Sequence, residues 1–329
     1  MGRALRFART RFEHGLLEWA GPRHAARGLL PMTDPAPPSC PLLPRRQLLA
    51  FGDELCVRDP RGRSRTPSLT PGPDGLSVHG PFVLRRRLLP TRARGVAFVD
   101  ATGDANPIHR KGEVVPGAFV AAQFASLVEV LFPALRLERL RATFSGPSWY
   151  DRALRLSLRA EPTPEGLRFE GVARQDEREV ASARLDARRA ARTRLPLSLE
   201  ALDGAWFLRV ATFYEALGIA PDAYFHTPDG PDLSYPLAFL ASLPSGSMVE
   251  RFDGAGGLLS RLTLRFGAAP LPIDGPPEVG LELPRRIRTS FNKIVTAVKR
   301  GVRTAVEGTA LVLPRGTVRG VLEEPPAAR

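Results

Sequence analysis

Long hydrophobic runs are absent from this sequence of 329 residues. The longest apolar stretches, such as residues 118–122, fall far short of the ~18 consecutive apolar residues that a membrane-spanning helix needs. We therefore expect a chain without a membrane span. Hydrophobic residues make up 43% of the chain and charged residues 25%, which is typical of a folded globular protein.

Cysteine is scarce. Cys40 and Cys56 are the only two, and they form neither a disulfide framework nor a CxxC pair. The N-terminus lacks the apolar core of a secretion signal, so a reducing cytoplasm is the expected location. His14, His24 and His79 show no metal-ligand spacing, and the chain has no phosphate loop or nucleophile elbow. We expect no metal and no organic cofactor.

Lysine is almost missing, although the formal net charge is +13. Of the 47 basic residues, all but Lys111, Lys293 and Lys299 are arginines, as a GC-rich coding sequence produces without selection for phosphate binding. The arginines are scattered and accompany no zinc-finger or aromatic RNA-binding pattern. We therefore expect no nucleic-acid partner, whereas a few arginines suit the phosphates of a carrier such as coenzyme A.

The ends of the chain have the composition of poorly ordered segments. Residues 1–80 are interpreted as a poorly ordered lead-in. Within it, residues 32–80 are rich in Pro, Ser, Gly and Arg and contain two apolar islands, able to donate a strand. Whether residues 1–31 belong to the native protein is left open. Residues 315–329 are expected to form a disordered tail.

Residues 81–190 show one helix of unusual composition, followed by strands. Residues 117–132 are apolar on nearly every side, so this helix must be wrapped by other structure. A shorter helix is expected from Thr91 to Thr102, with Thr91 as N-cap and Gly103 as the left-handed residue after its end. Alternating residues at 154–158, 167–174 and 179–186 predict antiparallel strands with tight turns. The pattern indicates a sheet curled around a helix.

Residues 197–314 partly repeat this order. Helices are expected at 206–218 and 235–243, the second cut short by Pro244, and strands at 258–266, 286–298 and 303–313. Residues 98–103 and 213–218 (FVDATG and FYEALG) form a weak internal repeat. Where the repeat would place a second aspartate the chain has Ile219, so this half lacks the polar motif described next.

The chemistry is concentrated in residues 101–109, ATGDANPIH. On a helix, Asp104 and His109 would lie about 140° apart and could not act on one small substrate. Pro107 disfavours a helix there and makes Asn106 extended, so a loop bent at Asn106–Pro107 is expected to aim both side chains at one point. A carboxylate and an imidazole around one water suit hydration of an α,β-unsaturated thioester.

The second part of the machinery is expected at Val114–Phe119, VVPGAF. Pro116 suits the start of a helix. The N–H of Gly117 then has no partner within the helix and, aided by the helix dipole, is placed to hold a thioester oxygen that gains negative charge.

The run Gly103–His109 resembles the signature Gly-Asp-x-Asn-Pro-Ile/Leu-His of MaoC-like (R)-specific enoyl-CoA hydratases and 3-hydroxyacyl-thioester dehydratases, over roughly residues 82–187. The resemblance implies an α+β double hot-dog: a catalytic domain at 81–190 and a degenerate second domain at 197–314. It makes Asp104 and His109 the catalytic pair and Gly117 the oxyanion donor. Residues expected to order the loop or contact substrate are Asn106, Pro107, Ile108, Ala118 and Phe119.

This sequence departs from the family pattern in a short loop after His109 and in Pro116, where many members have histidine. These changes put the rate and the chain-length preference in doubt. The predicted function is reversible addition of water to trans-2-enoyl thioesters, giving (R)-3-hydroxyacyl thioesters. Two alternatives stay open: a non-catalytic acyl-thioester-binding or scaffold protein of fatty-acid or polyketide metabolism, and a thioesterase. The acyl length, the carrier (coenzyme A or acyl carrier protein) and a homodimer also stay open.

Overall fold

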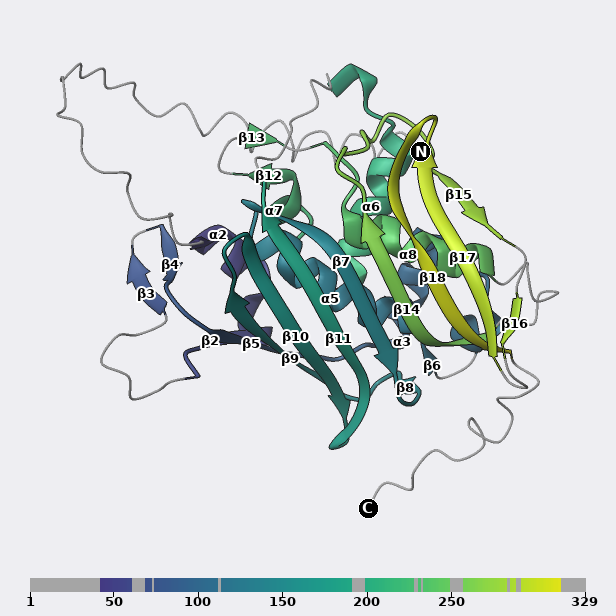
Figure 1. Ribbon diagram of the computed structural model, residues 1–329, viewed down its shortest axis with the longest axis horizontal. Helices are drawn as coiled ribbons and strands as arrows, with labels where there is room; N and C mark the ends of the chain where they lie inside the picture. Colours follow the sequence, from purple (N-terminus) through teal and green to yellow (C-terminus); the bar gives the residue numbers. More distant parts are fainter. Residues whose placement is uncertain are drawn as a thin grey trace. The chain divides into compact units, whose positions relative to one another are not determined.

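The computed structural model describes residues 42–60, 69–72, 74–111, 114–190, 199–227, 230–231, 233–248, 257–282, 285–287 and 291–314 (Figure 1). All of them belong to one compact unit, residues 40–329. Residues 1–41, 61–68 and 73 of the expected lead-in lie outside the described residues, and so does the expected tail, residues 315–329. Within the described residues, no helix is long and apolar enough to cross a membrane.

Antiparallel strands and a smaller set of helices make up this unit, which gives an α+β fold. The helices are α2 Arg45–Leu49, α3 Arg92–Thr102, α4 Pro107–Arg110, α5 Gly117–Leu131, α6 Gly204–Ala216, α7 Asp222–Phe225 and α8 Leu237–Met248, with 3-10 turns η1 Gly52–Glu54 and η2 Leu199–Ala201. The strands are β1 Leu42–Pro44, β2 Leu55–Arg58, β3 Leu69–Gly72, β4 Gly75–Val78, β5 Phe82–Leu88, β6 Val114–Val115, β7 Leu135–Phe144, β8 Ser148–Trp149, β9 Leu154–Pro162, β10 Gly166–Gln175, β11 Arg178–Arg189, β12 His226–Thr227, β13 Gly230–Pro231, β14 Gly257–Phe266, β15 Glu278–Leu281, β16 Arg285–Ile287, β17 Phe291–Arg300 and β18 Arg303–Pro314.

One large sheet runs through both halves of the chain. Its order is β15-β17-β18-β14-β7-β11-β10-β9-β5-β2, with β16 beside β17, among the strands that the structure describes. The halves join where β7 pairs antiparallel with β14, with Leu140 opposite Leu264. Helices α3, α5, α6 and α8 lie behind the sheet in Figure 1 and cover one of its faces. We call the opposite face the outer face.

The predicted central helix is confirmed as α5, which begins at Gly117 and whose residues from Ala118 to Leu131 are all buried. Its neighbour α3 has the expected ends. The Thr91 side chain accepts a hydrogen bond from the N–H of Arg94, and Gly103 is left-handed with φ 74°. The expected meander is confirmed as β9, β10 and β11. The lead-in also contains regular elements, because β2 pairs with β5 at the edge of the large sheet.

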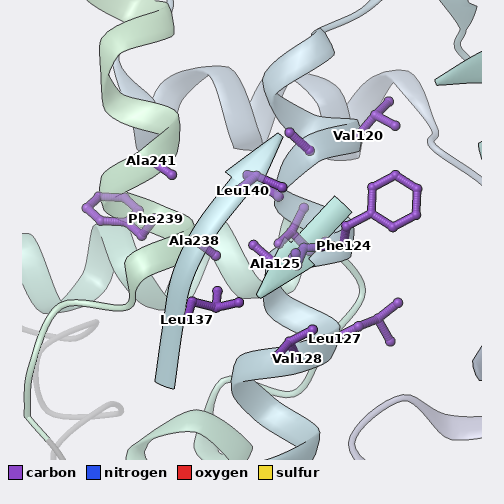
Figure 2. Close-up of a cluster of buried hydrophobic side chains, with 14 of the residues drawn as sticks. Val120, Phe124, Ala125, Leu127, Val128, Leu137, Leu140, Ala238, Phe239 and Ala241 are labelled. Atoms are coloured by element: carbon purple, nitrogen blue, oxygen red, sulfur yellow. The ribbon is translucent and has the colours of Figure 1, made fainter. Parts of the chain in front are cut away.

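The core is shared between the two halves. Figure 2 shows Leu137 and Leu140 of β7 between α5 side chains, such as Phe124, and α8 side chains, such as Phe239. All four of these side chains are buried. Burial of a large apolar side chain contributes about 1.5–3 kcal/mol, so packing of α5 and α8 over β7 holds the halves together.

Two polar side chains of α5 form hydrogen bonds across this junction. The Glu129 carboxylate accepts hydrogen bonds from the N–H groups of Leu237 (2.7 Å) and Ala238 (2.8 Å) at the start of α8. The Gln123 side chain donates to the carbonyl of Leu217 (3.2 Å), directly after α6. These two α5 side chains thus satisfy backbone groups at helix ends in the second half, where such groups lack intrahelical partners.

A buried arginine completes the junction. Arg86 of β5 donates to Gln123 (2.6 Å), to the carbonyls of Leu217 and Gly218 (2.8 Å each) and to the Glu54 carboxylate (2.8 Å). Burial lowers the pKa of its guanidinium, while its bond and its attraction to Glu54 oppose that shift. The Arg86 charge therefore depends on these hydrogen-bond partners, because an unpaired buried charge strongly destabilises the folded state.

The prediction that the apolar helix of the second half ends at Pro244 is wrong. Helix α8 continues to Met248 and contains Pro244. Proline removes one N–H from the helix ladder. The buried surface of this helix, which includes Phe239, Leu240 and Leu243, offsets that loss. The extra turn brings Ser245 and Gly246 to the loop that carries Asp104 and His109.

Candidate active site

The loop after α3 starts from a left-handed glycine. The N–H of Asp104 donates to the carbonyl of Val99 (2.9 Å), which closes the end of the helix around Gly103. A Cβ at Gly246 of α8 would lie 2.8 Å from the backbone of Gly103 and Thr102. Glycine at position 246 is therefore required for this close approach between α8 and the loop.

Asn106 organises the loop through three hydrogen bonds. Its N–H donates to Oδ1 of Asp104 (2.9 Å), and its own Oδ1 accepts from the N–H of Ile108 (3.1 Å). Its Nδ2 donates to the carbonyl of Gly257 (3.0 Å), the first residue of β14. The expected ordering role of Asn106 thus has a geometric basis that reaches into the second half of the chain.

No helix spans Asp104 to His109, as expected, but the segment from Pro107 onward is helical instead of a loop. Residues Pro107–Arg110 form the short helix α4, with Asn106 as its N-cap. Proline is favoured at the first helical position, where its missing N–H has no intrahelical acceptor to lose. Asn106 itself is extended, as expected (φ −60°, ψ 118°). A turn of helix that begins after Asp104, instead of one continuous helix, sets the direction of His109.

His109 is buried, with 4% of its surface exposed. Its Nδ1 lies 3.0 Å from the carbonyl oxygen of Val114. A carbonyl only accepts, so this bond assigns the proton to Nδ1 and leaves a lone pair on Nε2. Burial lowers the pKa of the imidazole, opposed by the nearby Asp104 carboxylate and by the bond to Val114. The ring is therefore held in its neutral, proton-accepting form.

Asp104 is also buried, with 1% of its surface exposed, and its two oxygens have different partners. Oδ1 accepts from the N–H of Asn106 (2.9 Å), and Oδ2 accepts from the hydroxyl of Ser245 (3.0 Å). Sequence reasoning missed Ser245, because Pro244 was interpreted as the end of its helix. The Tyr150 hydroxyl donates to the carbonyl of His109 (3.2 Å), and burial raises the pKa of that phenol.

Gly117 borders a cavity of about 230 Å³ at the start of α5. Its N–H, the first of the helix, has no hydrogen-bond acceptor among the described residues. A Cβ at this position would lie 3.2 Å from Leu259 and 3.4 Å from Phe144, so a side chain would crowd the cavity. Both halves line this cavity: Val114, Val115, Gly117, Val120, Phe144, Ser145, Gly146, Pro147, Ser148, Leu258, Leu259, Ser260, Phe291 and Leu313.

The expected site residues fall into two groups. Asp104, Asn106 and His109 lie together on the loop, and Val114, which bonds His109, also lines the cavity beside Gly117. Gly117 lines the cavity, whereas Asp104, Asn106 and His109 are not among its lining residues, and neither are the expected substrate-contacting residues. Ile108, Ala118 and Phe119 are buried in the core, Pro107 is half-buried, and none of the four lines the cavity. Phe119 packs edge-to-face on Phe98 (5.3 Å between ring centroids).

The comparisons concern the fold. No protein-family model matches the chain, and no curated protein matches its sequence. A solved MaoC-like dehydratase has a TM-score of 0.52 at 10% identity, over 69% of this chain and 95% of its own. HtdX of Mycobacterium tuberculosis has a TM-score of 0.47 at 15% identity, over 69% of this chain and 98% of its own.

A MaoC-like dehydratase from Phytophthora capsici gives a TM-score of 0.49 at 9% identity, over 71% of this chain and 95% of its own. The match with a TM-score of 0.52, at 10% identity, shows a shared fold and not a shared reaction. The chain therefore has the hot-dog fold of the MaoC-like proteins, to which its Gly103–His109 motif is similar.

Proposed function

We propose that the protein is a hydratase/dehydratase that adds water reversibly to trans-2-enoyl thioesters and gives (R)-3-hydroxyacyl thioesters. The observation that carries this proposal is the state of His109: a buried neutral imidazole, protonated on Nδ1 by its bond to Val114, beside the buried carboxylate of Asp104. A neutral base beside a carboxylate, in a loop fixed by Asn106, suits proton transfer to and from one water.

The chemistry follows from these positions. The thioester oxygen accepts a hydrogen bond from the N–H of Gly117, and the Asp104–His109 pair binds the water. As the water oxygen bonds to C3, the Asp104–His109 pair takes a proton from the water. On His109, the nitrogen that can accept this proton is Nε2. The C2=C3 electrons move toward the thioester oxygen, where Gly117 and the dipole of α5 stabilise the charge. A proton returned to C2 completes the addition, so protons balance.

The second half supports the site in this proposal. We infer two fused hot-dog domains, with residues 81–190 catalytic and residues 197–314 degenerate. The second half supplies Ser245 to Asp104, the Gly257 carbonyl to Asn106, and Leu258, Leu259, Phe291 and Leu313 to the cavity. Its own counterpart of the motif has Ile219, a buried apolar residue, where the first half has Asp104.

Hydration of crotonyl-CoA and longer 2-enoyl-CoAs, followed by loss of enoyl absorbance, tests the proposal. We expect wild type to turn over, and Asp104→Asn and His109→Ala each to lose roughly 100-fold or more in kcat. The double variant should lose little more than the worse single one, because the pair acts as a unit. Since the His109 pKa is lowered, kcat/KM should stay high at neutral pH and fall only in acid, as the imidazole becomes protonated.

The alternative of a binding protein makes a different prediction. If no chain length is hydrated while the folded protein still binds acyl-CoA in calorimetry, the catalytic proposal fails. Circular dichroism of the two variants shows whether a loss of activity reflects a loss of folding.

A further inference from the structure

The outer face of the large sheet carries a groove with an unusual lining. The groove measures about 590 Å³ and lies across β2, β5, β9 and β10. Five exposed arginines line it: Arg58, Arg85, Arg87, Arg155 and Arg174. We call this feature the arginine groove. The proposed reaction uses none of these residues.

Most of these charges have no carboxylate partner. Arg155 pairs with Glu177. The other carboxylate that lines the groove, Glu54, is bound to the buried Arg86 (2.8 Å). Within the described part of the chain, Arg85, Arg87 and Arg174 form no ion pair. The groove therefore has a surplus of positive charge that an external anion can neutralise.

The strand register brings like charges together. Arg87 of β5 lies opposite Arg155 of β9, which in turn lies opposite Arg174 of β10. Directly opposed residues have Cβ atoms about 4.5–5.5 Å apart, and like charges at that distance are destabilising. On its other side Arg174 lies opposite Glu179 of β11, and Arg155 pairs with Glu177, so repulsion is only partly balanced within the chain. An acidic surface that covers the row would complement the remaining charge.

The row lies close to the candidate active site. Arg174 precedes Gln175, whose side chain donates to the carbonyl of Trp149 in β8 (2.8 Å). Ser148, the neighbour of Trp149 in β8, lines the cavity. Strand β10 is two strands from β7, whose last residue Phe144 also lines the cavity, a lateral distance of about 10 Å.

The lining favours a protein over a nucleotide or a lipid. None of the residues that line the groove is aromatic, so it offers no ring on which a nucleic-acid base or the adenine of coenzyme A can stack. The exposed large apolar residues of the described chain, such as Leu89, are not among its lining, so it has no side chain to insert into a membrane. Between the arginines its floor is formed by the half-buried Val172 and Ser157, whereas the Leu156 side chain is buried in the core. Arginine is a residue type enriched at protein interfaces.

We propose that the arginine groove docks the acidic surface of a protein that carries the acyl thioester, and so presents the acyl group to the cavity beside Gly117. The delivery part of this inference rests on the proposed function, whereas the docking part does not. Docking steered by charge is fast at low salt and weakens as salt screens it.

Binding is measured first, without turnover. A fluorescent acidic acyl carrier protein, bearing no acyl group, is titrated with the full-length protein at 50 and 300 mM salt. We expect binding that weakens markedly with salt, and a Kd raised roughly tenfold by Arg87→Glu. Arg303→Glu, the same charge change on the exposed hairpin between β17 and β18, is the matched control and should stay within about twofold of wild type. Arg87→Gln, which removes the charge without reversing it, should give an intermediate Kd.

Kinetics then test delivery. Arg87→Glu should raise KM for crotonyl attached to the carrier protein and leave KM for crotonyl-CoA unchanged. Equal effects of Arg87→Glu and Arg303→Glu on carrier binding would overturn the docking proposal, as would tighter binding to single-stranded RNA or to anionic phospholipid vesicles than to the carrier.

The two proposals fail in distinguishable ways. If crotonyl-CoA is hydrated but carrier binding ignores Arg87, docking fails and the hydratase function stands. If neither substrate is hydrated but the binding pattern holds, docking stands and the hydratase function fails.

Discussion

At the scale of single residues, the motif singled out a loop that the structure orders and buries. Asp104 and His109 are both buried, and Asn106 fixes the loop between them. The partners from distant parts of the chain were not predictable. Ser245 reaches Asp104 across 141 positions of sequence, and Gly257 reaches Asn106 across 151. No local pattern encodes such contacts, because they arise from the packing of α8 and β14 against the first half.

The bond from Ser245 to Asp104 leads to a prediction. Removing the hydroxyl with Ser245→Ala should lower kcat roughly tenfold and leave KM nearly unchanged, because a hydrogen bond to a charged group contributes about 1.5–3 kcal/mol. Ser245 acts through Asp104, so it is a positioning residue. Ser245→Thr, which keeps the hydroxyl, should recover most of the rate in the crotonyl-CoA assay.

Ser242 supplies the matched control for that prediction. It lies on the same helix, and its hydroxyl donates within the helix to the carbonyl of Ala238 (2.8 Å). Ser242→Ala should keep kcat within about twofold. If both alanine variants lose the same activity, the effect comes from α8 as a whole, and the positioning role of Ser245 is wrong.

At the scale of elements, different signals predicted α3, α5 and the β9–β11 meander: the capping residues Thr91 and Gly103, the apolar composition of residues 117–132 on nearly every side, and the alternation of the strands. Alternation missed β7, the strand that joins the halves. Glu138 interrupts the alternation of Leu137 and Leu140, and the pairing of β7 with β11 shifts register at this point. A bulge inserts one unpaired residue, so the two-residue period of the sequence is lost although the strand continues.

Glu129 determines how α8 begins. Its carboxylate accepts two N–H groups at the start of α8, at 2.7 and 2.8 Å. Glu129→Gln removes the charge and one acceptor, and should lower the free energy of unfolding by about 1–2 kcal/mol in urea denaturation. Glu138→Gln, at an exposed position 3.8 Å from Arg188, should change it by less than about 0.5 kcal/mol. Equal losses in the two variants would contradict the capping role.

At the scale of the whole molecule, the sequence predicted two repeated units and left their joining open. The structure joins them through one sheet, by β7 with β14, and through the contact of α5 with α8. It also places Arg86 between β5, α5 and the end of α6. Burial of a long polar side chain has no signature in sequence, since Arg86 stands in a run of three arginines whose other two members are exposed.

A junction of this extent predicts that both halves unfold in one transition. Each half carries one tryptophan in the described chain, Trp149 in β8 and Trp206 in α6. In a Trp19→Phe background, Trp149→Phe and Trp206→Phe leave one reporter per half. The two urea curves followed by fluorescence should share one midpoint and one slope, because neither half can lose the shared sheet and keep its core. Separate midpoints would show that the β7–β14 pairing and the Arg86 contacts are too weak to couple the halves. The candidate site, which draws residues from both halves, would then open as soon as the less stable half unfolds.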